Sequence, residues 1–277
     1  MKLNLKTFAA VLLIIILTFT TCVSFAESHM PEHGKTAKNG SLIVDHAHAS
    51  DGYIFVTGEK TSKKLKIAIS LNGNAKVHYN LNNKGEEEIL PLQYGSGKYT
   101  VSLYRQISGT KYKKIGELSF NVKMQDERAY MLYPNQMVDY DTTTEAVKYA
   151  DELCAGMTDE HEIIMTVYDY MNKNFSYDFF KSGDVLRGTL KEILPDIDGT
   201  WLTKTGICQD LAAIMCAMLR SQGVHARFTV GTLNGTAHAW VTAYYYNEEG
   251  KLMSMSLDPT YHCGVSAKYG YKTERYY

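Results

Sequence analysis

Apolar residues recur with two different periods along the chain. Before residue 125, short segments alternate apolar and polar positions, as half-buried strands do, and Asn and Gly turn signals separate them. Strands at this spacing predict a small antiparallel β sandwich over residues 41–124. The expected strands lie at residues 53–57, 65–71, 76–80, 99–104 and 117–122.

From residue 142 onward the apolar period becomes helical. Residues 158–174 carry an amphipathic pattern, and a further helix is predicted from about Ile207 to Gln222. Gly223 follows this helix at the position where a left-handed residue commonly ends a helix. Residues 178–203, between the two helices, contain several Gly and Pro residues and are predicted as loops.

A β meander is expected after the second helix. Asn234-Gly235 is a strong two-residue hairpin signal between strands predicted at 224–233 and 236–246, and a third strand follows at 251–257. A helix packed on this antiparallel sheet makes the fold class α+β, with one domain over residues 142–277. A linker at 125–141 would join this domain to the sandwich, whose strand spacing is immunoglobulin-like.

The N-terminus carries the pattern of an export signal. Lys2 and Lys6 precede a short apolar run, and small residues ending at Ala26 resemble a cleavage site. Because the run is short for a membrane span, we predict a signal peptide over residues 1–26 and a secreted, extracellular or cell-surface location, with no membrane span after cleavage. Two alternatives are a retained signal anchor and lipid attachment at Cys22, although Thr20-Thr21 matches poorly the small residues expected before a lipidated cysteine. Residues 27–40 would form a flexible lead.

Composition narrows the classes of function. Hydrophobic residues make up 45% and charged residues 21%, which supports a packed core and argues against global disorder. The formal net charge of −1 gives no electrostatic reason to expect nucleic acid as a partner. The segment Asp196-Ile-Asp198-Gly199 hints at calcium but lacks a complete ligand loop. We therefore expect no cofactor and no metal.

We expect at most one disulfide among the cysteines. Cys154, Cys208, Cys216 and Cys263 would remain after cleavage, and a chain of this length does not need cross-links. Cys154 with Cys263 is the one pair we consider, and a chain with all thiols free is equally compatible. Cys216 fits a place in the core.

Three residues carry candidate chemistry. Cys208 falls in the first turn of the predicted helix, where free N–H groups and the positive helix end stabilise a thiolate. His238 and Asp258 follow on successive strands. A thiolate attacks a carbonyl carbon, a histidine moves the proton and a carboxylate orients the imidazole, so the set predicts acyl transfer. The backbone N–H of Cys208 could bind the oxyanion.

The second hairpin can bring His238 and Asp258 together. With a three-residue loop after Tyr246, His238 faces Asp258 directly, whereas with a four-residue loop it faces the next residue, Pro259. We favour the three-residue loop or a bulged equivalent.

Four motifs surround the candidate residues: Gly206-Ile-Cys208-Gln-Asp-Leu-Ala, Leu219-Arg220-Ser-Gln-Gly223-Val-His-Ala-Arg227, His238-Ala-Trp240-Val and Asp258-Pro-Thr260-Tyr. Together they resemble the core of the transglutaminase-like superfamily, in a secreted microbial form. The resemblance implies a papain-like catalytic domain with Cys208 as nucleophile, His238 as base and Asp258 as orienting carboxylate. It implies a polar or aromatic oxyanion residue upstream of the cysteine; Trp201, Tyr177 and Gln209 are the candidates for the oxyanion hole. It also makes Arg227 the structural arginine of the family.

Three functions remain open at this stage. The first is a secreted thiol enzyme that hydrolyses amide bonds of peptides or proteins through a thioester. The second resolves the thioester with an amine and forms isopeptide cross-links. The third, of another class, is a non-catalytic cell-surface binding protein. In each case the β sandwich is a candidate binder of a cell-surface or cell-wall component. The Tyr-rich segment 269–277 could line a substrate cleft or pack against the meander.

Overall fold

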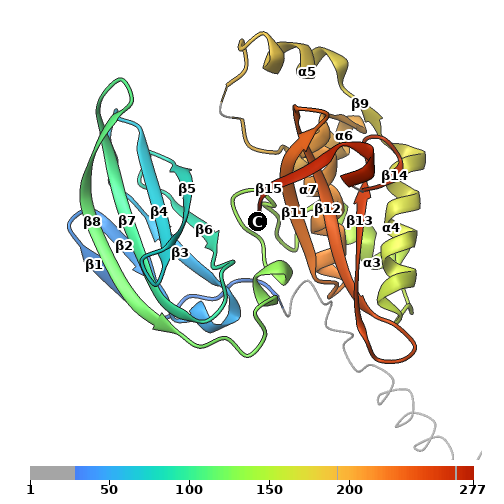
Figure 1. Ribbon diagram of the computed structural model, residues 1–277, viewed down its shortest axis with the longest axis horizontal. Coiled ribbons are helices and arrows are strands. Elements are labelled where there is room, and N and C mark those ends of the chain that lie inside the picture. The colour runs from blue at the N-terminus through green and yellow to red at the C-terminus, as the bar shows by residue number, and fades with distance from the viewer. Residues whose placement is uncertain (1–28, 192, 266) are drawn as a thin grey trace, which may run out of the picture.

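The computed structural model describes residues 29–191, 193–265 and 267–277. A β-rich half, blue to green, stands beside a half that combines helices with a sheet, yellow to red (Figure 1). The fold is therefore α+β, as the sequence predicts. The predicted signal peptide lies outside the described residues. Within the described part of the chain, no helix has the length and apolar character needed to cross a bilayer.

The β-rich half contains two antiparallel sheets of four strands each. Side chains that alternate along the strands meet between the sheets: Ile54 and Val56 from one, and Ile67 and Ile69 from the other, are fully buried. This alternation is the pattern seen in the sequence, and burial of these side chains supplies the main stabilisation of the sandwich. The strand order is β1-β2-β3-β6 in one sheet, with bounds Thr36–Asn39, Leu42–Asp45, Tyr53–Thr57 and Glu87–Pro91, and β5-β4-β7-β8 in the other, with bounds Ala75–Leu81, Leu65–Leu71, Gly97–Ser108 and Lys111–Val122.

The N-terminal lead differs from the prediction. Residues 36–39 were expected to be flexible, but they form β1, which pairs with β2 at the edge of the first sheet. The strand has few apolar residues and stays largely exposed. Pairing of its backbone with β2, rather than burial of its side chains, therefore orders this segment, and a hydrophobic pattern cannot reveal it.

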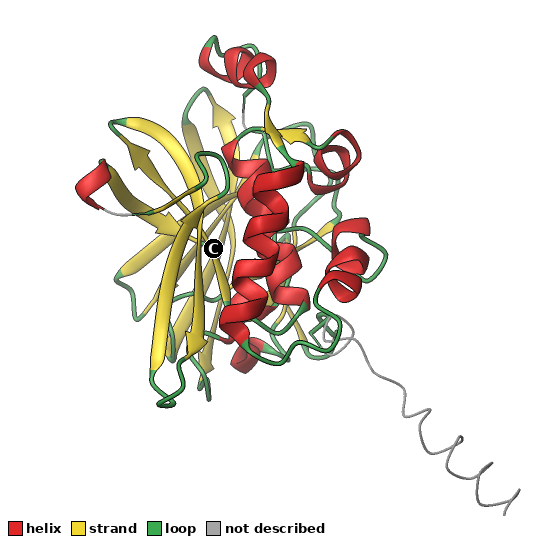
Figure 2. Ribbon diagram, turned by 90° about the vertical axis from the view of Figure 1, so that its right-hand side faces the viewer, coloured by secondary structure: helices red, strands yellow, loops and turns green. Residues whose placement is uncertain are grey.

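The second half places helix α7 against a five-stranded antiparallel sheet of order β14-β13-β12-β11-β15. Helices α3, α4 and α6 pack against α7, and Figure 2 shows helices gathered on one side of the molecule, whereas α5 stands apart at the top (Figure 1). The helices are α3 (Glu145–Leu153), α4 (Glu160–Asn174), α5 (Phe179–Leu186), α6 (Ile197–Thr203) and α7 (Cys208–Ser221). The strands are β9 (Ser176–Tyr177), β10 (Thr205–Gly206), β11 (Ala226–Leu233), β12 (Thr236–Tyr246), β13 (Leu252–Asp258), β14 (Cys263–Gly264) and β15 (Tyr271–Tyr276), and three short 3-10 helices lie at Ala49–Asp51, Ala129–Leu132 and Ala267–Tyr269.

The prediction of loops between α4 and α7 is wrong in part, because this segment contains α5 and α6. Each helix begins at an aspartate whose side chain caps it: Asp178 Oδ1 accepts from Lys181 N–H at 2.8 Å, and Asp196 Oδ1 accepts from Gly199 N–H at 2.9 Å. Such caps stabilise short helices that lack a regular apolar stripe. The Asp196–Gly199 segment, which hinted at calcium, is thus a helix cap. No group of three His, Cys, Asp or Glu in the described ranges could hold a metal ion.

Contacts between the two halves fix how they meet. Gln93 Oε1 accepts a 3.0 Å hydrogen bond from the phenol of Tyr79 on β5, and Gln93 Nε2 donates to the carbonyl of Tyr276 on β15 at 2.8 Å. The rings of Tyr79 and Tyr277 also meet, with centroids 5.6 Å apart. An outer strand of the sandwich therefore lies beside an outer strand of the second sheet.

Candidate active site

Cys208 is the first residue of α7, as the sequence predicts. Ile207 caps the helix in an extended conformation, and its N–H donates to Asp210 Oδ2 at 2.9 Å. The cysteine side chain is half-buried, so it lies at the positive end of the helix and remains open to solvent. At the other end of the helix, Gly223 adopts a positive φ of 77°, which favours glycine at this position.

The first hairpin forms as predicted, while the register of the second differs from both predicted registers. Leu233 pairs with Thr236 across a two-residue turn. In the second hairpin, Tyr246 pairs with Leu252, because residues 247–251 form a five-residue loop closed by Asn247 N–H donating to the Lys251 carbonyl at 3.0 Å. His238 and Asp258 are therefore diagonal rather than directly opposed neighbours. They still lie on one face, because side chains alternate with a period of two.

The structure joins His238 to Asp258. Nε2 of the imidazole lies 2.6 Å from Oδ2 of the carboxylate, and both side chains are buried. The phenol of Tyr271 on β15 donates to the same oxygen at 2.6 Å, and the backbone N–H of Thr260 donates to the other oxygen at 2.8 Å. Tyr271 was not singled out from the sequence, because its contact with Asp258 depends on the pairing of β15 with β11.

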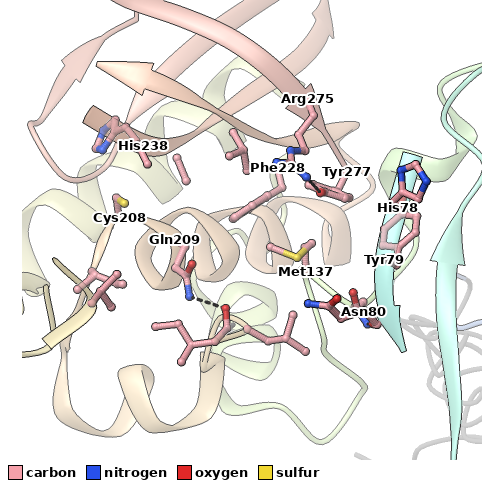
Figure 3. A pocket seen from close by; sticks show the side chains of 18 of the residues that line it. His78, Tyr79, Asn80, Met137, Cys208, Gln209, Phe228, His238, Arg275 and Tyr277 are labelled. Carbon is pink, nitrogen blue, oxygen red and sulfur yellow. Dashed lines mark hydrogen bonds between the residues drawn. The ribbon is translucent and has the colours of Figure 1, made fainter. Parts of the chain in front are cut away.

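Cys208 lies next to His238 (Figure 3), and its interaction with the imidazole contributes to the pKa of His238. Burial alone would lower the pKa of His238, but the hydrogen bonds and negative charges of Asp258 and Cys208 raise it to about 9. Burial would raise the pKa of Asp258, yet the hydrogen bonds from His238, Tyr271 and the Thr260 backbone, with the charge of His238, hold it below its usual value. Both shifts favour an imidazolium held between a carboxylate and the sulfur.

A buried carboxylate organises the loops next to Cys208. Asp210 is fully buried on the first turn of α7, and its Oδ2 accepts from Lys181 Nζ of α5 at 2.7 Å. Its Oδ1 accepts from the Asp196 N–H at 3.1 Å, at the start of α6. One side chain thus connects α5 and α6 to the end of α7 that carries the cysteine. The sequence places Asp210 in a motif but does not reveal these partners.

A cleft of about 620 Å³ opens onto the cysteine. Residues of the half that contains α7 and residues of strand β5 in the sandwich line this cleft together, so it runs between the two halves of the molecule (Figure 3). Val185 and Leu194, from α5 and the loop after it, form part of its wall. Cys208, Gln209 and His238 line the cleft on one side, and His78, Tyr79 and Asn80 line it on the other.

The candidate oxyanion residues fall in different places. Tyr177 lies on β9, which pairs with the strand just before Cys208. Burial raises the pKa of Tyr177, the hydrogen bond with Ser182 opposes this rise, and the charge of Cys208 adds to it. Gln209 lines the cleft but donates to the Ile193 carbonyl at 3.4 Å, away from His238 (Figure 3). Trp201 packs instead on Lys204, whose ammonium lies 3.0 Å from its ring centroid, so the structure does not bring Trp201 to Cys208.

The remaining cysteines and arginines also have defined places. Cys154, Cys208 and Cys216 carry free thiols, so the Cys154–Cys263 bridge does not form. Cys154 ends helix α3, whereas Cys263 lies on β14.

Arg220, in the last turn of α7, is fully buried, whereas Arg227, after the helix, is only partly buried. Arg220 donates to three carbonyls, those of Ala226, Tyr133 and Tyr277, at 2.9, 2.7 and 3.0 Å. Arg227 lies over the ring of Tyr276 at 4.4 Å. The two arginines are seven positions apart in the sequence, and only their contacts in the folded chain show which of them is buried.

Comparison with known proteins agrees with this architecture. Residues 147–255 match the sequence model of the transglutaminase-like superfamily, so this part of the chain is a transglutaminase-like domain. The match and the placement of Cys208 support a cysteine-based enzyme at the level of the superfamily. No significant match was found among curated proteins.

Solved structures of low sequence identity are also similar. A candidate cysteine protease from Cytophaga hutchinsonii is 12% identical, with a TM-score of 0.39 and coverage of 82% of this chain and 78% of that one. The periplasmic domain of TgpA from Pseudomonas aeruginosa, bound to ethylmercury, is 18% identical, with a TM-score of 0.35 and coverage of 82% and 75%. Red sea bream transglutaminase is 14% identical, with a TM-score of 0.30; the match covers 75% of this chain and only 47% of that protein. Likeness at this level carries no argument about the reaction.

Proposed function

We propose that the protein is a thiol enzyme that hydrolyses amide bonds of peptides or proteins, with Cys208 as nucleophile, His238 as proton carrier and Asp258 as the orienting carboxylate. The observation that carries the proposal is the position of His238 between Cys208 and Asp258, with its pKa raised to about 9. An imidazolium beside a sulfur stabilises the thiolate, which is the reactive form of cysteine.

In the first step the Cys208 thiolate attacks the amide carbonyl carbon and a C–S bond forms. The oxygen gains negative charge, which the backbone N–H of Cys208 is placed to bind at the start of α7. Tyr177 is a second candidate donor because its strand pairs with the strand just before Cys208 and the charge of Cys208 acts on its phenol. His238 then donates its proton to the leaving amine as the C–N bond breaks, and a thioester remains.

In the second step water attacks the thioester. His238, now neutral, takes a proton from the water, the C–S bond breaks and the carboxylic acid leaves. Asp258 keeps the imidazole in one orientation through both steps, because its Oδ2 accepts the Nε2–H of His238. Half-exposed Cys208 in an open cleft gives water access to the thioester, which supports hydrolysis over transfer to an amine.

One experiment separates the two reactions. The purified protein lacking residues 1–26 is incubated with glutamine-containing peptides and a labelled primary amine, with the Cys208→Ala variant as control. We expect shortened or deamidated peptides and no label on them. Stable incorporation of the amine would instead assign isopeptide formation. The absence of any product, together with a Cys208 that reacts no faster than the other thiols, would leave the non-catalytic binding function.

The proposed site of action is outside the cytoplasm, on the basis of the N-terminal pattern of Lys2, Lys6, an apolar run and Ala26. Fractionation of cells that express the full chain, followed by mass determination of the N-terminus, tests it. A mature protein starting at residue 27 in the medium or at the cell surface is expected. An intact N-terminus in the cytoplasm would contradict it.

A further inference from the structure

Strand β5 presents an open backbone edge to the cleft. It is the outer strand of its sheet, paired with β4 alone, and among the described residues no strand pairs with its other side. Residues 78–82 of this strand and its end line the same cleft as Cys208. An outer strand carries a row of N–H and C=O groups that another extended chain can pair with.

Hydrogen bonds elsewhere in the sheet show which residues of β5 face outward. The N–H of Gln106 on β7 donates to the backbone carbonyl of Lys64 at 2.9 Å, and the N–H of Asn72 donates to the backbone carbonyl of Lys98 on β7 at 2.8 Å. The backbone groups of even-numbered residues of β4 therefore point to β7, and those of odd-numbered residues point to β5. Since Ile67 pairs with Tyr79 and Ile69 with Val77, the odd residues of β5 bond to β4. The backbone N–H and C=O groups of residues 76, 78 and 80 then point to the open edge of the sheet.

Two side chains already bond to this edge at its cleft end. Gln136 Nε2 donates to the carbonyl of Asn80 at 2.6 Å, and Glu88 Oε1 accepts from the N–H of Asn82 at 2.5 Å. Both contacts fit the outward direction of the even residues. The N–H and C=O of His78 and the N–H of Asn80 remain directed to the cleft, and His78 and Asn80 are exposed.

The edge holds a fixed position relative to Cys208. Tyr79, on the same strand, is buried and bonds through Gln93 to β15 of the catalytic sheet. Among the described residues, the walls of the cleft include the apolar Met137, Phe228 and Val230. The charged side chains there, Glu88 and Arg275, are single groups of opposite sign and form no cluster that would select a charged small molecule. Such a cleft suits a polypeptide whose own backbone satisfies the strand edge and whose side chains contact the walls.

We propose that the substrate is an extended polypeptide that pairs with β5 as an added strand while one of its amide bonds reaches Cys208. The inference rests on the proposed function and names its substrate class. It makes the β sandwich a wall of the substrate site. A polypeptide segment several residues long, unfolded at the point of cleavage, is the substrate, rather than a small amide or a compactly folded surface.

Backbone variants test the proposal. His78→Pro removes the outward N–H and is compatible with an outer strand, where proline is tolerated when its nitrogen faces away from the sheet. Lys38→Pro is the matched control, because it places a proline on the outer strand β1. The backbone groups of the even residues of β1 also face outward, since the carbonyl of Lys35 accepts from the His46 N–H at 3.0 Å. Lys38 does not line the cleft. His78→Ala removes the imidazole and keeps the N–H. A pool of unfolded decapeptides serves as substrate, with cleavage followed by mass spectrometry.

We expect His78→Pro to lower kcat/KM for the decapeptides about tenfold, the effect of losing one or two backbone hydrogen bonds, and Lys38→Pro to leave it near that of the parent protein. Alkylation of Cys208 by iodoacetamide reports whether the site itself is intact in each variant. Equal loss in His78→Ala and His78→Pro would assign binding to the imidazole and overturn the proposal. Equal turnover by His78→Pro and the parent protein would overturn it as well.

A second measurement does not depend on the folding of a proline variant. Hydrogen exchange at residues 76–80 is measured in Cys208→Ala protein with and without the decapeptide pool. Slower exchange with peptide is expected, and unchanged exchange overturns the proposal. If the parent protein cleaves no peptide but exchange slows, the proposed hydrolysis fails while strand pairing stands; if peptides are cleaved without any change at β5, hydrolysis stands and strand pairing fails.

Discussion

The phenol of Tyr271 donates a hydrogen bond to the Asp258 oxygen that also contacts His238. The two donors approach Oδ2 at 2.6 Å each, and Tyr271 is buried. Tyr271 lies on β15 at the edge of the sheet, whereas Asp258 ends β13 near the opposite edge. An outer strand therefore helps to set the position and charge of the carboxylate on which the imidazole depends.

Removing this phenol should alter the pH profile. Tyr271→Phe keeps the ring and deletes the O–H that holds down the pKa of Asp258, so the carboxylate becomes easier to protonate. We expect kcat/KM to fall about tenfold, the effect of one hydrogen bond to a charged group, and its acidic limb to move to higher pH. Tyr269→Phe, on an exposed ring nearby, is the control. A tenfold loss with an unmoved acidic limb would mean that Tyr271 only packs.

Activity should decline as the pH rises through about 9. The pKa of His238 lies above the usual 6.5, and the protonated ring is the form that pairs with the thiolate and donates to the leaving amine. The same shift stabilises the folded state fully below pH 6.5, and this contribution disappears as the pH rises through about 9. Measuring kcat/KM from pH 5 to 10 checks the alkaline limb; a limb near the usual value for histidine would refute the coupling.

Asp258→Asn should move that alkaline limb to lower pH. The substitution keeps the size of the side chain and removes the charge that raises the pKa of His238. We also expect kcat to fall by about 10³–10⁴, the effect seen when a triad carboxylate is made an amide. Asp126→Asn, which removes a carboxylate outside the cleft, is the comparison. Retention of both kcat and the limb in Asp258→Asn would remove Asp258 from the proposed triad.

Cys208 should react with alkylating reagents faster than Cys154 and Cys216. Burial raises the pKa of Cys154 to about 11 and that of Cys216 to about 12, so both stay protonated near neutral pH. Cys208 lies instead at a helix start beside His238. At pH 6 we expect iodoacetamide to label Cys208 at least about 100-fold faster than the other two. Peptide mapping measures this, and His238→Ala should remove most of the advantage; uniform slow labelling would exclude a thiolate at Cys208.

Loss of the Asp210 carboxylate should destabilise the protein. Asp210→Ala leaves the Ile207 and Asp196 N–H groups without their acceptor and separates Lys181 from its buried partner. We expect the free energy of unfolding to fall by about 3 kcal/mol, measured by urea denaturation. Glu145→Ala, on an exposed ion pair, should leave the midpoint unchanged. If both variants unfold at the parent midpoint, Asp210 does not hold these loops.

Local signals in the sequence were enough to predict the elements around the site. The Asn234-Gly235 turn gives the first hairpin because both residues take positive φ, at 50° and 85°. Cys208 at a helix start follows from the apolar stripe of residues 211–219 and from Gly223. The alternation of Leu65, Ile67 and Ile69 gives β4 with its observed bounds. The immunoglobulin-like shape of the sandwich and the catalytic roles of the three site residues stay predictions.

Features that depend on distant or unusual backbone contacts were not predictable in this way. The second hairpin has a five-residue loop because Asn247 bonds across it to Lys251, and neither predicted register allowed for this. His238 still reaches Asp258, since the shift leaves both on one face. The links from Asp210 to Lys181 and from Tyr271 to Asp258 join residues 29 and 13 positions apart, and only the folded chain brings them together.

The amide of Gln93 spans the seam between Tyr79 and Tyr276. The half that contains α7, if isolated, would therefore keep Cys208 and His238 but lose the wall of the cleft that strand β5 forms. We expect such a fragment to react with small electrophiles at Cys208 and to show no preference for longer peptide substrates. Under the proposed function, selectivity for extended chains therefore depends on how the two halves are joined, and substitutions at their contact could change it while leaving Cys208 and His238 in place.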